Sequence, residues 1–417
     1  MFRFGERAAW MPALCGMALA ACLPCERALA GHLDVLHAFK KSTHGLEPGT
    51  GMIQGPAGKL YGTTFYGGND TCDTGGAGCG VVFAISADGH EKVVYAFTGG
   101  LDGYGPAGGL VKDGAGNIYG TAEVGGADGF GTVFKIASDG GETTLYTFKG
   151  GTDGSYPLGS LIMDSAGNLY GTTEEGGGAT NTCSTGCGTV FKVAPGGAES
   201  VLYAFSGMNG DGYNPVGGLA LDSSGNLYGT TEFGGAGCSF GCGIFFRVSP
   251  AGTETILHTF GGFANDDGSL PAADLMTDRK GTIFGTTRTG GNSNNCGLAG
   301  CGTIFSFTPG GSFNVGFAFQ GGADGAQPAG GVVEDKSGNL YGSTSEGGVV
   351  TNDCQAGCGT LYAVSSGGVG STLYTFDGGK GGADPVGDLV MDASGNLYGT
   401  STGGDVLTGG AAFRIKK

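Results

Sequence analysis

The chain has 417 residues, of which 95 are glycine, roughly three times the usual share of about 7%. The glycines do not fall at every third position, which excludes collagen, and a content of 39% hydrophobic and 10% aromatic residues excludes a disordered linker. Only 14% of the residues are charged, and the net charge of −17 excludes a basic surface for nucleic acid or for an anionic membrane.

Residues 1–30 differ in composition from the rest of the chain and resemble a secretory signal peptide. Arg3 and Arg7 precede an apolar run, and Ala28-Leu29-Ala30 forms a small-residue cleavage signal. No later stretch approaches about 18 consecutive apolar residues, so we expect no transmembrane segment in the mature protein. We predict an exported protein, periplasmic or extracellular, in which residues 31–417 form a single domain.

The leader also has a second interpretation, because Leu19-Ala20-Ala21-Cys22 resembles a bacterial lipoprotein signal in which Cys22 becomes the lipidated N-terminus. Cleavage after Ala30 removes Cys15, Cys22 and Cys25 and leaves ten cysteines in close pairs. Cleavage before Cys22 would leave Cys25 without a partner. The cysteine pairing therefore favours soluble export over a lipid anchor at Cys22.

A short motif of an aliphatic residue, an aromatic residue and glycine recurs at a period of roughly 56 residues. Its seven copies are residues 60–62, 118–120, 169–171, 227–229, 283–285, 340–342 and 397–399. Each copy contains four short runs of strand character separated by turns, which in the second copy are residues 109–112, 117–123, 131–137 and 144–148. This pattern predicts an all-β fold, a seven-bladed β-propeller with four-stranded blades. A β-solenoid is the alternative, although its coils are usually shorter.

The two ends of the chain predict a closed ring. Residues 35–39 have the sequence of a fourth strand, and the chain finishes just after residues 411–415, which have the sequence of a third strand. The last repeat lacks only what the first residues supply. We therefore predict that the N-terminal strand pairs into the last blade and leaves no long open sheet edge.

The repeated aromatic residues are expected to fill the spaces between adjacent blades. They include Phe83, Phe134, Phe191 and Phe305 in the third strand, and Tyr146, Phe148, Tyr203, Phe205, Tyr374 and Phe376 in the fourth. Burial of each is worth on the order of 2 to 3 kcal/mol. We interpret them as core residues and not as a stacking platform for a ligand.

Ten cysteines lie in one loop, between the second and third strands. They form the close pairs Cys72/Cys79, Cys183/Cys187, Cys238/Cys242, Cys296/Cys301 and Cys354/Cys358. In an exported chain this spacing predicts five local disulfides. Two cysteines per blade without a histidine in these loops argue against zinc, which needs about four ligands.

The link from each fourth strand to the next first strand carries Asp-Gly-x-x-Pro in five repeats. The motif begins at Asp102, Asp153, Asp211, Asp267 and Asp324. In the predicted strand order this loop and the cysteine loop emerge on the same face, where a ring of carboxylates would suit calcium. Because the motif recurs in nearly every blade, turn chemistry is the favoured interpretation, and no cofactor is predicted.

Positions at which the repeats differ are better candidates for function. At the end of the second strand the repeats carry Phe65, Glu123, Glu174, Glu232, Arg288, Ser345 and Thr402. Three successive blades thus place an acid, and such acids could bind a cation or the hydroxyls of a sugar. Glu123, Glu174 and Glu232 are the predicted ligand-binding residues, with solvated loop-edge carboxylates as the alternative. No catalytic residue is predicted.

The repeated motifs also resemble a known family. Gly-Asn-Leu-Tyr-Gly-Thr-Thr at residues 167–173 and 225–231, with Gly-Thr-Val-Phe-Lys at residues 131–135 and 188–192, resembles the GloVer tandem repeat of bacterial exported proteins. The resemblance covers nearly all of residues 33–417. It implies no activity, cofactor or catalytic residue.

Two functions are compatible with these features. The favoured one is a binding or structural propeller for a glycan or protein partner, and we expect a monomer. The alternative is a metal-assisted propeller enzyme of the lyase or lactonase type. An enzyme needs blade-specific polar residues that converge at the channel mouth, whereas a scaffold can remain nearly symmetric.

Overall fold

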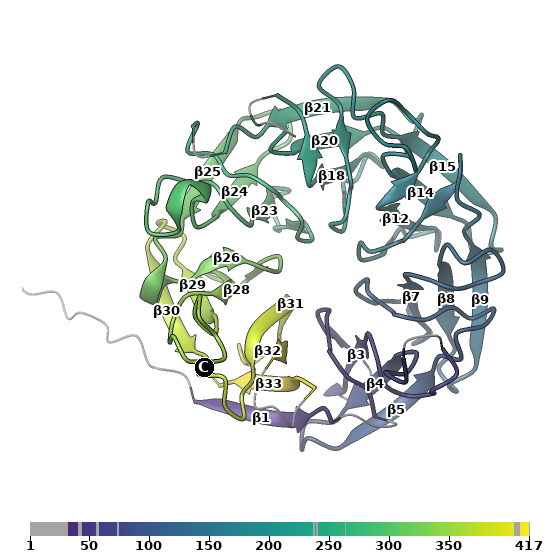
Figure 1. Ribbon diagram of the computed structural model, residues 1–417, viewed down its shortest axis with the longest axis horizontal. Helices are drawn as coiled ribbons and strands as arrows, with labels where there is room; N and C mark the ends of the chain where they lie inside the picture. Colours follow the sequence, from purple (N-terminus) through teal and green to yellow (C-terminus); the bar gives the residue numbers. More distant parts are fainter. Residues whose placement is uncertain are drawn as a thin grey trace, which may run out of the picture.

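The computed structural model describes residues 32–40, 44–55, 58–72, 75–236, 238, 241–262, 264–403 and 409–416. These residues form seven antiparallel four-stranded sheets arranged as blades around one axis (Figure 1), so the predicted seven-bladed β-propeller is confirmed. The predicted signal peptide and Cys22 lie outside the described residues. Within the described ranges, no helix is long and apolar enough to cross a membrane.

The first strand of each blade lies nearest the axis and the fourth lies at the perimeter (Figure 1). The first strands are β2 (Ile53–Gln54), β6 (Val111–Lys112), β11 (Ile162–Met163), β17 (Ala220–Leu221), β22 (Met276–Thr277), β27 (Val333–Glu334) and β31 (Ala383–Met391). The second strands are β3 (Leu60–Thr64), β7 (Ile118–Ala122), β12 (Leu169–Thr173), β18 (Leu227–Thr231), β23 (Ile283–Thr287), β28 (Leu340–Glu346) and β32 (Leu397–Gly403).

The outer half of each blade has the same regularity. The third strands are β4 (Val81–Ile85), β8 (Thr132–Ile136), β14 (Thr189–Val193), β20 (Ile244–Val248), β24 (Thr303–Phe307), β29 (Thr360–Val364) and β33 (Ala411–Ile415). The fourth strands are β5 (Glu91–Ala96), β9 (Glu142–Thr147), β15 (Glu199–Ala204), β21 (Glu254–Thr259), β25 (Phe313–Ala318), β30 (Gly370–Thr375) and, for the last blade, β1 (Leu33–Ala38).

Short additional elements occupy the loops. Two-residue ladders join β10 (Gly154–Ser155) to β13 (Glu175–Gly176) and β16 (Gly212–Tyr213) to β19 (Phe233–Gly234), and β26 (Ala326–Pro328) extends the pairing of β28. Single turns of 3₁₀ helix, η2 (Gly297–Ala299) and η3 (Gly322–Asp324), lie in loops of blades 5 and 6. All these elements belong to the links that meet on one face of the ring.

The ring is closed by the N-terminal strand, as predicted. β1 pairs antiparallel with β33, so the purple and yellow ends of the chain lie side by side in Figure 1. The carboxylate of Asp34 accepts a 2.6 Å hydrogen bond from Arg414 Nη2 and lies 2.9 Å from the ammonium of Lys416. Hydrogen bonds from Lys416 and Arg414 hold the pKa of Asp34 well below its usual range. Backbone pairing and an ion pair thus fasten the same two strands.

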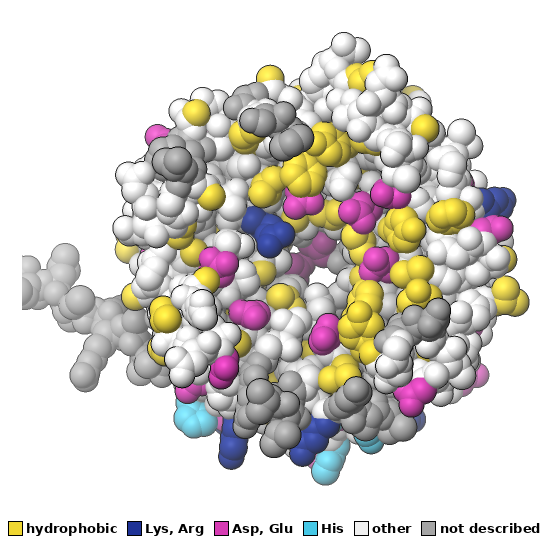
Figure 2. All heavy atoms as spheres, in the orientation of Figure 1, with side chains coloured by type: hydrophobic (Ala, Val, Ile, Leu, Met, Phe, Trp, Pro, Cys, Tyr) yellow, Lys and Arg dark blue, Asp and Glu magenta, His cyan; other side chains and the backbone are white. Residues whose placement is uncertain are grey.

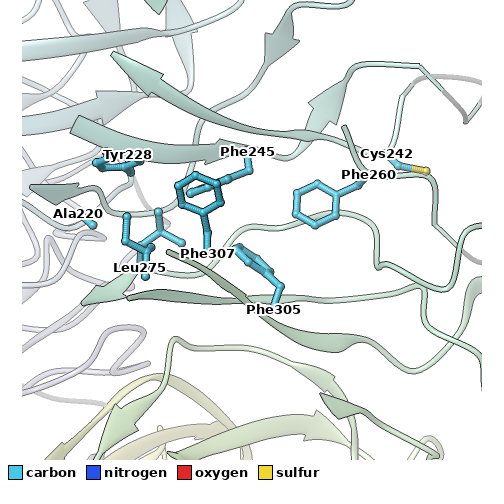
Figure 3. Close-up of a cluster of buried hydrophobic side chains, with 9 residues drawn as sticks. Ala220, Tyr228, Cys242, Phe245, Phe260, Leu275, Phe305 and Phe307 are labelled. Atoms are coloured by element: carbon cyan, nitrogen blue, oxygen red, sulfur yellow. The ribbon is translucent and has the colours of Figure 1, made fainter. Parts of the chain in front are cut away.

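Each blade packs on the next through one aromatic pair. The phenylalanine directly after each fourth strand meets the third-strand aromatic ring of the following blade, with ring centroids 4.9 to 5.4 Å apart. The latter value separates two buried phenylalanines that face one another between blades 4 and 5 in Figure 3. The seven pairs are Phe39–Phe83, Phe97–Phe134, Phe148–Phe191, Phe205–Phe246, Phe260–Phe305, Phe319–Tyr362 and Phe376–Phe413. The interpretation of the repeated aromatics as core is confirmed.

The repeated glycine of the second strand makes room for this packing. A Cβ atom added to Gly171 would lie 2.7 Å from Cζ of Phe191 and 2.9 Å from Cδ2 of Leu161. Those distances are shorter than carbon atoms tolerate, and equivalent close approaches occur at the corresponding glycines of the other blades. The motif therefore needs glycine after the tyrosine, because the aromatic ring of the neighbouring third strand lies over that position.

The repeated tyrosine of the second strand is tied to the hairpin that precedes it. In blade 3, Asp164 Oδ1 accepts hydrogen bonds from the N–H groups of Ala166 and Asn168, while Oδ2 accepts from the Asn168 amide and from the Tyr170 hydroxyl. The same set recurs at Asp113, Asp222, Asp335 and Asp392. The tyrosine ring thus contributes to the core while its hydroxyl closes the hairpin.

Gly171→Ala is expected to destabilise the fold by about 2 kcal/mol, because the added methyl group must displace the Phe191 ring or the Leu161 side chain. Gly114→Ala is the matched control, since a Cβ there meets open space in an exposed hairpin. Chemical denaturation of both variants measures the difference. Equal stabilities would contradict the steric explanation of the Tyr-Gly motif.

Candidate functional site

The axis of the propeller contains a hollow of about 330 Å³ that opens on the face of the disulfide loops. Small residues line most of it, and Figure 2 shows acidic side chains gathered around the central opening. At its floor each repeat contributes one residue, located three positions after the loop proline. These residues are Gly51, Gly109, Ser160, Gly218, Asp274, Gly331 and Asp388. Four repeats use glycine, so the three side chains there break the sevenfold pattern.

Asp274 and Asp388 form a carboxyl pair at this floor. Asp274 Oδ1 accepts a 2.6 Å hydrogen bond from the Gly218 N–H, and Asp388 Oδ1 accepts an equally short one from the Gly331 N–H. Burial inside the ring, followed by the charge of Asp274, raises the pKa of Asp388 well above its ordinary value. A hydrogen bond with Asp274 raises the pKa of Asp388 further, so the Asp388 carboxyl keeps its proton to a higher pH than a free aspartate does.

Comparison of the seven residues that lie three positions after the loop proline could have found this pair. The aligned residue is glycine in four repeats and serine or aspartate in the others. The end of the second strand, where Glu123, Glu174 and Glu232 lie, does not reveal it. A second hollow of about 220 Å³ lies on the other side of the floor and shares Ser160, Asp274 and Asp388. The three polar side chains therefore separate the two halves of the channel.

The three predicted acids directly follow the second strands of neighbouring blades, at the positions equivalent to Arg288 and Ser345, which line the central hollow. The acids themselves are not among the lining residues of the hollow. Burial raises the pKa of Glu123, Glu174 and Glu232. The charge of Glu174 adds to the effect at Glu123, and the charges of Glu175 and Glu232 add to it at Glu174. The three side chains thus form an arc of half-buried carboxyl groups on successive blades. They are not the fully solvated loop-edge acids of the alternative interpretation.

The equivalent residues of the next two blades lie further around the mouth. Arg288 and Ser345 line the central hollow, and the charge of Arg288 partly offsets the effect of burial on the pKa of Glu232. The side-chain amide of Asn214 donates a 3.2 Å hydrogen bond to Glu174 Oε1. The mouth is therefore acidic on one side and basic or neutral on the other. Across the described residues, no three His, Cys, Asp or Glu side chains are grouped so as to hold a metal ion.

A second ring of side chains borders this mouth. In every blade the residue before the loop proline has a positive φ between 50° and 64°. The seven residues, called here the left-handed ring, are Glu47, Gly105, Tyr156, Asn214, Leu270, Gln327 and Asp384. The carbonyl of such a residue accepts a hydrogen bond from the end of the second strand, as from the N–H of Glu174 to Tyr156 and of Glu232 to Asn214. The arc of acids and the left-handed ring are thus adjacent.

The disulfide loops support the left-handed ring. All five predicted disulfides are present, and they join Cys72 to Cys79, Cys183 to Cys187, Cys238 to Cys242, Cys296 to Cys301 and Cys354 to Cys358. The carbonyl of the second cysteine of each accepts a hydrogen bond of 2.9 to 3.0 Å from the left-handed residue of the next blade, as at Cys187 and Asn214. The prediction that the two loops share one face is confirmed. Five disulfides are typical of proteins from oxidising compartments.

Both members of each cysteine pair lie in the loop between the second and third strands, as predicted, but they differ in burial. The second member is a core residue with no exposed surface, and it packs into a hydrophobic cluster. The physical reason is that the buried third strand begins only two residues later, so the chain has already entered the space between blades. The five buried residues are Cys79, Cys187, Cys242, Cys301 and Cys358. They anchor the loops from inside and are unavailable to a ligand, whereas their partners are half-buried or exposed.

The aspartates of Asp-Gly-x-x-Pro accept hydrogen bonds from residues in and just after the preceding fourth strand. Asp102 accepts hydrogen bonds from the Tyr95 hydroxyl and from the N–H and hydroxyl of Thr98. Asp211 is bound in the same manner by Tyr203 and Ser206. The interpretation of this motif as turn chemistry is therefore confirmed for these blades.

The fold and the site together define a seven-bladed β-propeller with an axial channel whose mouth is lined by blade-specific side chains. The profile of the Gloeobacter/Verrucomicrobia repeat matches residues 27–182, 70–299 and 177–413. The chain therefore belongs to this repeat family, as the resemblance of its motifs indicated. No curated protein matches the chain.

Several solved structures share the fold at low sequence identity. A fungal alcohol oxidase of the AA5 family, in complex with copper, has 14% identity and a TM-score of 0.57 over 93% of this chain and 76% of its own. The extracellular domain of a B. thetaiotaomicron protein classed as a one component system has 9% identity and a TM-score of 0.55, and this chain spans only 40% of it. A protein classed as a gluconolactonase has 11% identity over 93% and 92% of the two chains, but a TM-score of 0.43. These likenesses concern the fold alone.

Asp388→Asn is expected to remove a pH dependence of stability. Because the folded-state pKa of Asp388 is raised, the stability it contributes is fully present below its unfolded pKa and is lost as the pH rises. Asparagine keeps an acceptor for the Gly331 N–H and carries no charge. The melting temperature should therefore rise more at pH 8 than at pH 4.

Asp164→Asn is the contrasting variant. Burial acts to raise the pKa of Asp164, but hydrogen bonds from Asn168 and Tyr170 outweigh it and lower the pKa. Its stabilising effect is present above the unfolded pKa and lost in acid, so this variant should lose stability at pH 8. Equal shifts at both pH values for Asp388→Asn would contradict the raised pKa of Asp388.

Proposed function

We propose that the protein is an exported binding propeller that holds a glycan at the mouth of its central channel. The leader-like residues 1–30 and the five disulfides support export to the periplasm or the outside. The hollow of about 330 Å³ and its blade-specific rim support a binding role.

The observation that carries the proposal is the left-handed ring. A non-glycine residue in this conformation costs roughly 1 to 2 kcal/mol, and Gly105 shows that the fold accepts glycine at this position. Six blades nevertheless keep a side chain there. Because strained residues of this kind cluster at binding and catalytic sites, we infer that these side chains are kept for contacts with a ligand.

The chemistry of the acidic side suits a sugar. The raised pKa values of Glu123, Glu174 and Glu232 let their carboxyl groups keep a proton to a higher pH than free glutamate, and a protonated carboxyl group both donates to and accepts from hydroxyl groups. The rings of Tyr213 and Phe233 stack beside this arc with centroids 5.3 Å apart. Flat aromatic faces next to oriented polar groups are what a polyhydroxylated ring needs.

A glycan is therefore favoured over a protein partner, which would need a larger surface than this hollow provides. The enzyme alternative, a metal-assisted lyase or lactonase, uses the same channel. Calcium remains a prediction at this site, so binding is measured both with added Ca²⁺ and with a chelator.

The test is retention of the protein on immobilised neutral and amino-sugar polysaccharides, followed by calorimetry with the oligosaccharide that retains it. The Glu123→Ala, Glu174→Ala, Glu232→Ala triple variant should bind at least tenfold more weakly. Tyr156→Gly should bind more weakly while the fold becomes as stable or more stable, because glycine relieves the left-handed strain.

Asp139→Ala, an exposed carboxylate on the opposite face, is the matched control and should bind as the unmodified protein does. Unchanged binding in the triple variant would contradict the site. Absence of retention on every sugar, with specific capture of one purified protein instead, would replace the glycan by a protein partner. Turnover of a lactone or uronate polymer that the triple variant loses would favour the enzyme.

A further inference from the structure

One blade differs from the others at the β-bulge of its fourth strand. Each fourth strand leaves one residue unpaired with the third strand at this bulge. The seven residues are Leu36, Val94, Leu145, Leu202, Leu257, Gly316 and Leu373. The six aliphatic side chains pack into the cores between blades. Blade 5 has no side chain to place there.

The backbone does not require glycine at this position. A Cβ on Gly316 would meet only the carbonyl oxygen of Ile304, at 3.7 Å, which is an ordinary contact distance. Its φ lies outside the left-handed region. Gly171, by contrast, has no room for a methyl group. The absence of a side chain at Gly316 therefore leaves open space, and no turn at this position requires glycine.

This space belongs to a cavity of about 610 Å³ between blades 5 and 6. Its apolar wall includes Phe284, Ile304, Phe317, Leu340 and Val364. The cavity lies beside the first hairpins of both blades and therefore on the face opposite the channel mouth. Its size and aromatic lining are those of a small-molecule site.

A second substitution widens the cavity. In blades 2 and 3 the ammonium groups of Lys135 and Lys192 lie 5.8 and 5.7 Å from the ring centroids of the cross-strand tyrosines. In blade 5 the cross-strand pair is Phe284 with Ser306. The short serine leaves the face of the Phe284 ring uncovered, and both residues line the cavity.

The polar rim of the cavity has unused hydrogen-bonding capacity. In five other hairpins the Oδ2 atom of the aspartate accepts hydrogen bonds from an asparagine amide and a tyrosine hydroxyl. Blade 5 has Thr282 and Phe284 at those two positions, and Asp278 Oδ1 accepts only the N–H groups of Lys280 and Thr282. Within the described chain no donor reaches Asp278 Oδ2. Glu334 adds a second carboxylate to the rim and Lys280 a single cation.

We propose that the cavity between blades 5 and 6 binds a small amphipathic molecule with a flat apolar ring and a cationic, hydrogen-bond-donating head. The ring lies against Phe284 and Phe317 in the space left by Gly316. The head donates to Asp278 Oδ2 and is favoured by the charge of Glu334. This site is separate from the channel mouth and does not depend on the function proposed for it.

Calorimetry of the full chain with tryptamine tests the proposal, with indole-3-acetate as the ligand of opposite charge. Tryptamine should bind, and indole-3-acetate should bind at least tenfold more weakly. Gly316→Leu restores the side chain used by the other blades, so it should weaken tryptamine binding at least tenfold and raise the melting temperature. Ser306→Lys covers Phe284 and should also weaken binding, which keeps the test decisive if Gly316→Leu does not fold.

Val315→Leu is the matched control, since Val315 is an exposed neighbour on the same strand and should leave binding unchanged. Asp278→Asn should reduce the preference for tryptamine over indole-3-acetate. The proposal is overturned if tryptamine does not bind the unmodified protein at millimolar concentration, or if folded Gly316→Leu and Ser306→Lys bind it as well as the unmodified protein. Equal binding of the two indoles would overturn the assignment of a cationic head.

Discussion

The contact between the phenylalanine that follows each fourth strand and the third-strand aromatic ring of the next blade determines most of what the repeats have in common. It occurs seven times, with fully buried rings such as Phe205 and Phe246 about 5.0 Å apart. Burial of each aromatic side chain contributes on the order of 2 to 3 kcal/mol. The propeller as a whole is therefore stabilised by many equivalent and modest contributions. The glycine beneath each third-strand ring follows from the same contact, because a Cβ there would overlap it.

Because this contact is needed in every blade, candidate functional positions are those at which the repeats differ. Positions that serve the contact between blades are nearly invariant among the seven repeats, and the hairpin aspartate binds the repeated tyrosine in five of them. The channel floor, the channel mouth and the bulge of the fourth strand are free to differ. Such positions hold Asp274 and Asp388 at the floor, Glu123, Glu174 and Glu232 after the second strands, and Gly316 at the bulge. The disulfide loops hold the backbone of the mouth in place while its side chains change from blade to blade.

Periodicity alone was enough to predict the blades, the closure by residues 35–39 and the five disulfides, since each depends on residues that recur at fixed spacing. Spacing could not show that Cys79 and its counterparts are core residues, because burial depends on the neighbouring blade. The left-handed conformation of Tyr156 was not predictable either, because nothing in a tyrosine indicates a positive φ. The Asp274–Asp388 pair joins repeats 5 and 7, so neither repeat reveals it by itself. Gly316 was visible in the sequence, but only the structure shows that its space is open and not filled by a neighbouring chain segment.

The claim that one repeated contact holds a closed ring is tested most directly by comparing Phe39→Ala with Phe205→Ala. Phe39 follows the N-terminal strand and packs on Phe83 across the closure, whereas Phe205 makes the equivalent contact within the continuous chain. If the ring is closed as described, both variants should lose about 3 to 5 kcal/mol of unfolding free energy in chemical denaturation. A loss below about 1 kcal/mol for Phe39→Ala, with the full loss for Phe205→Ala, would contradict closure by the N-terminal strand.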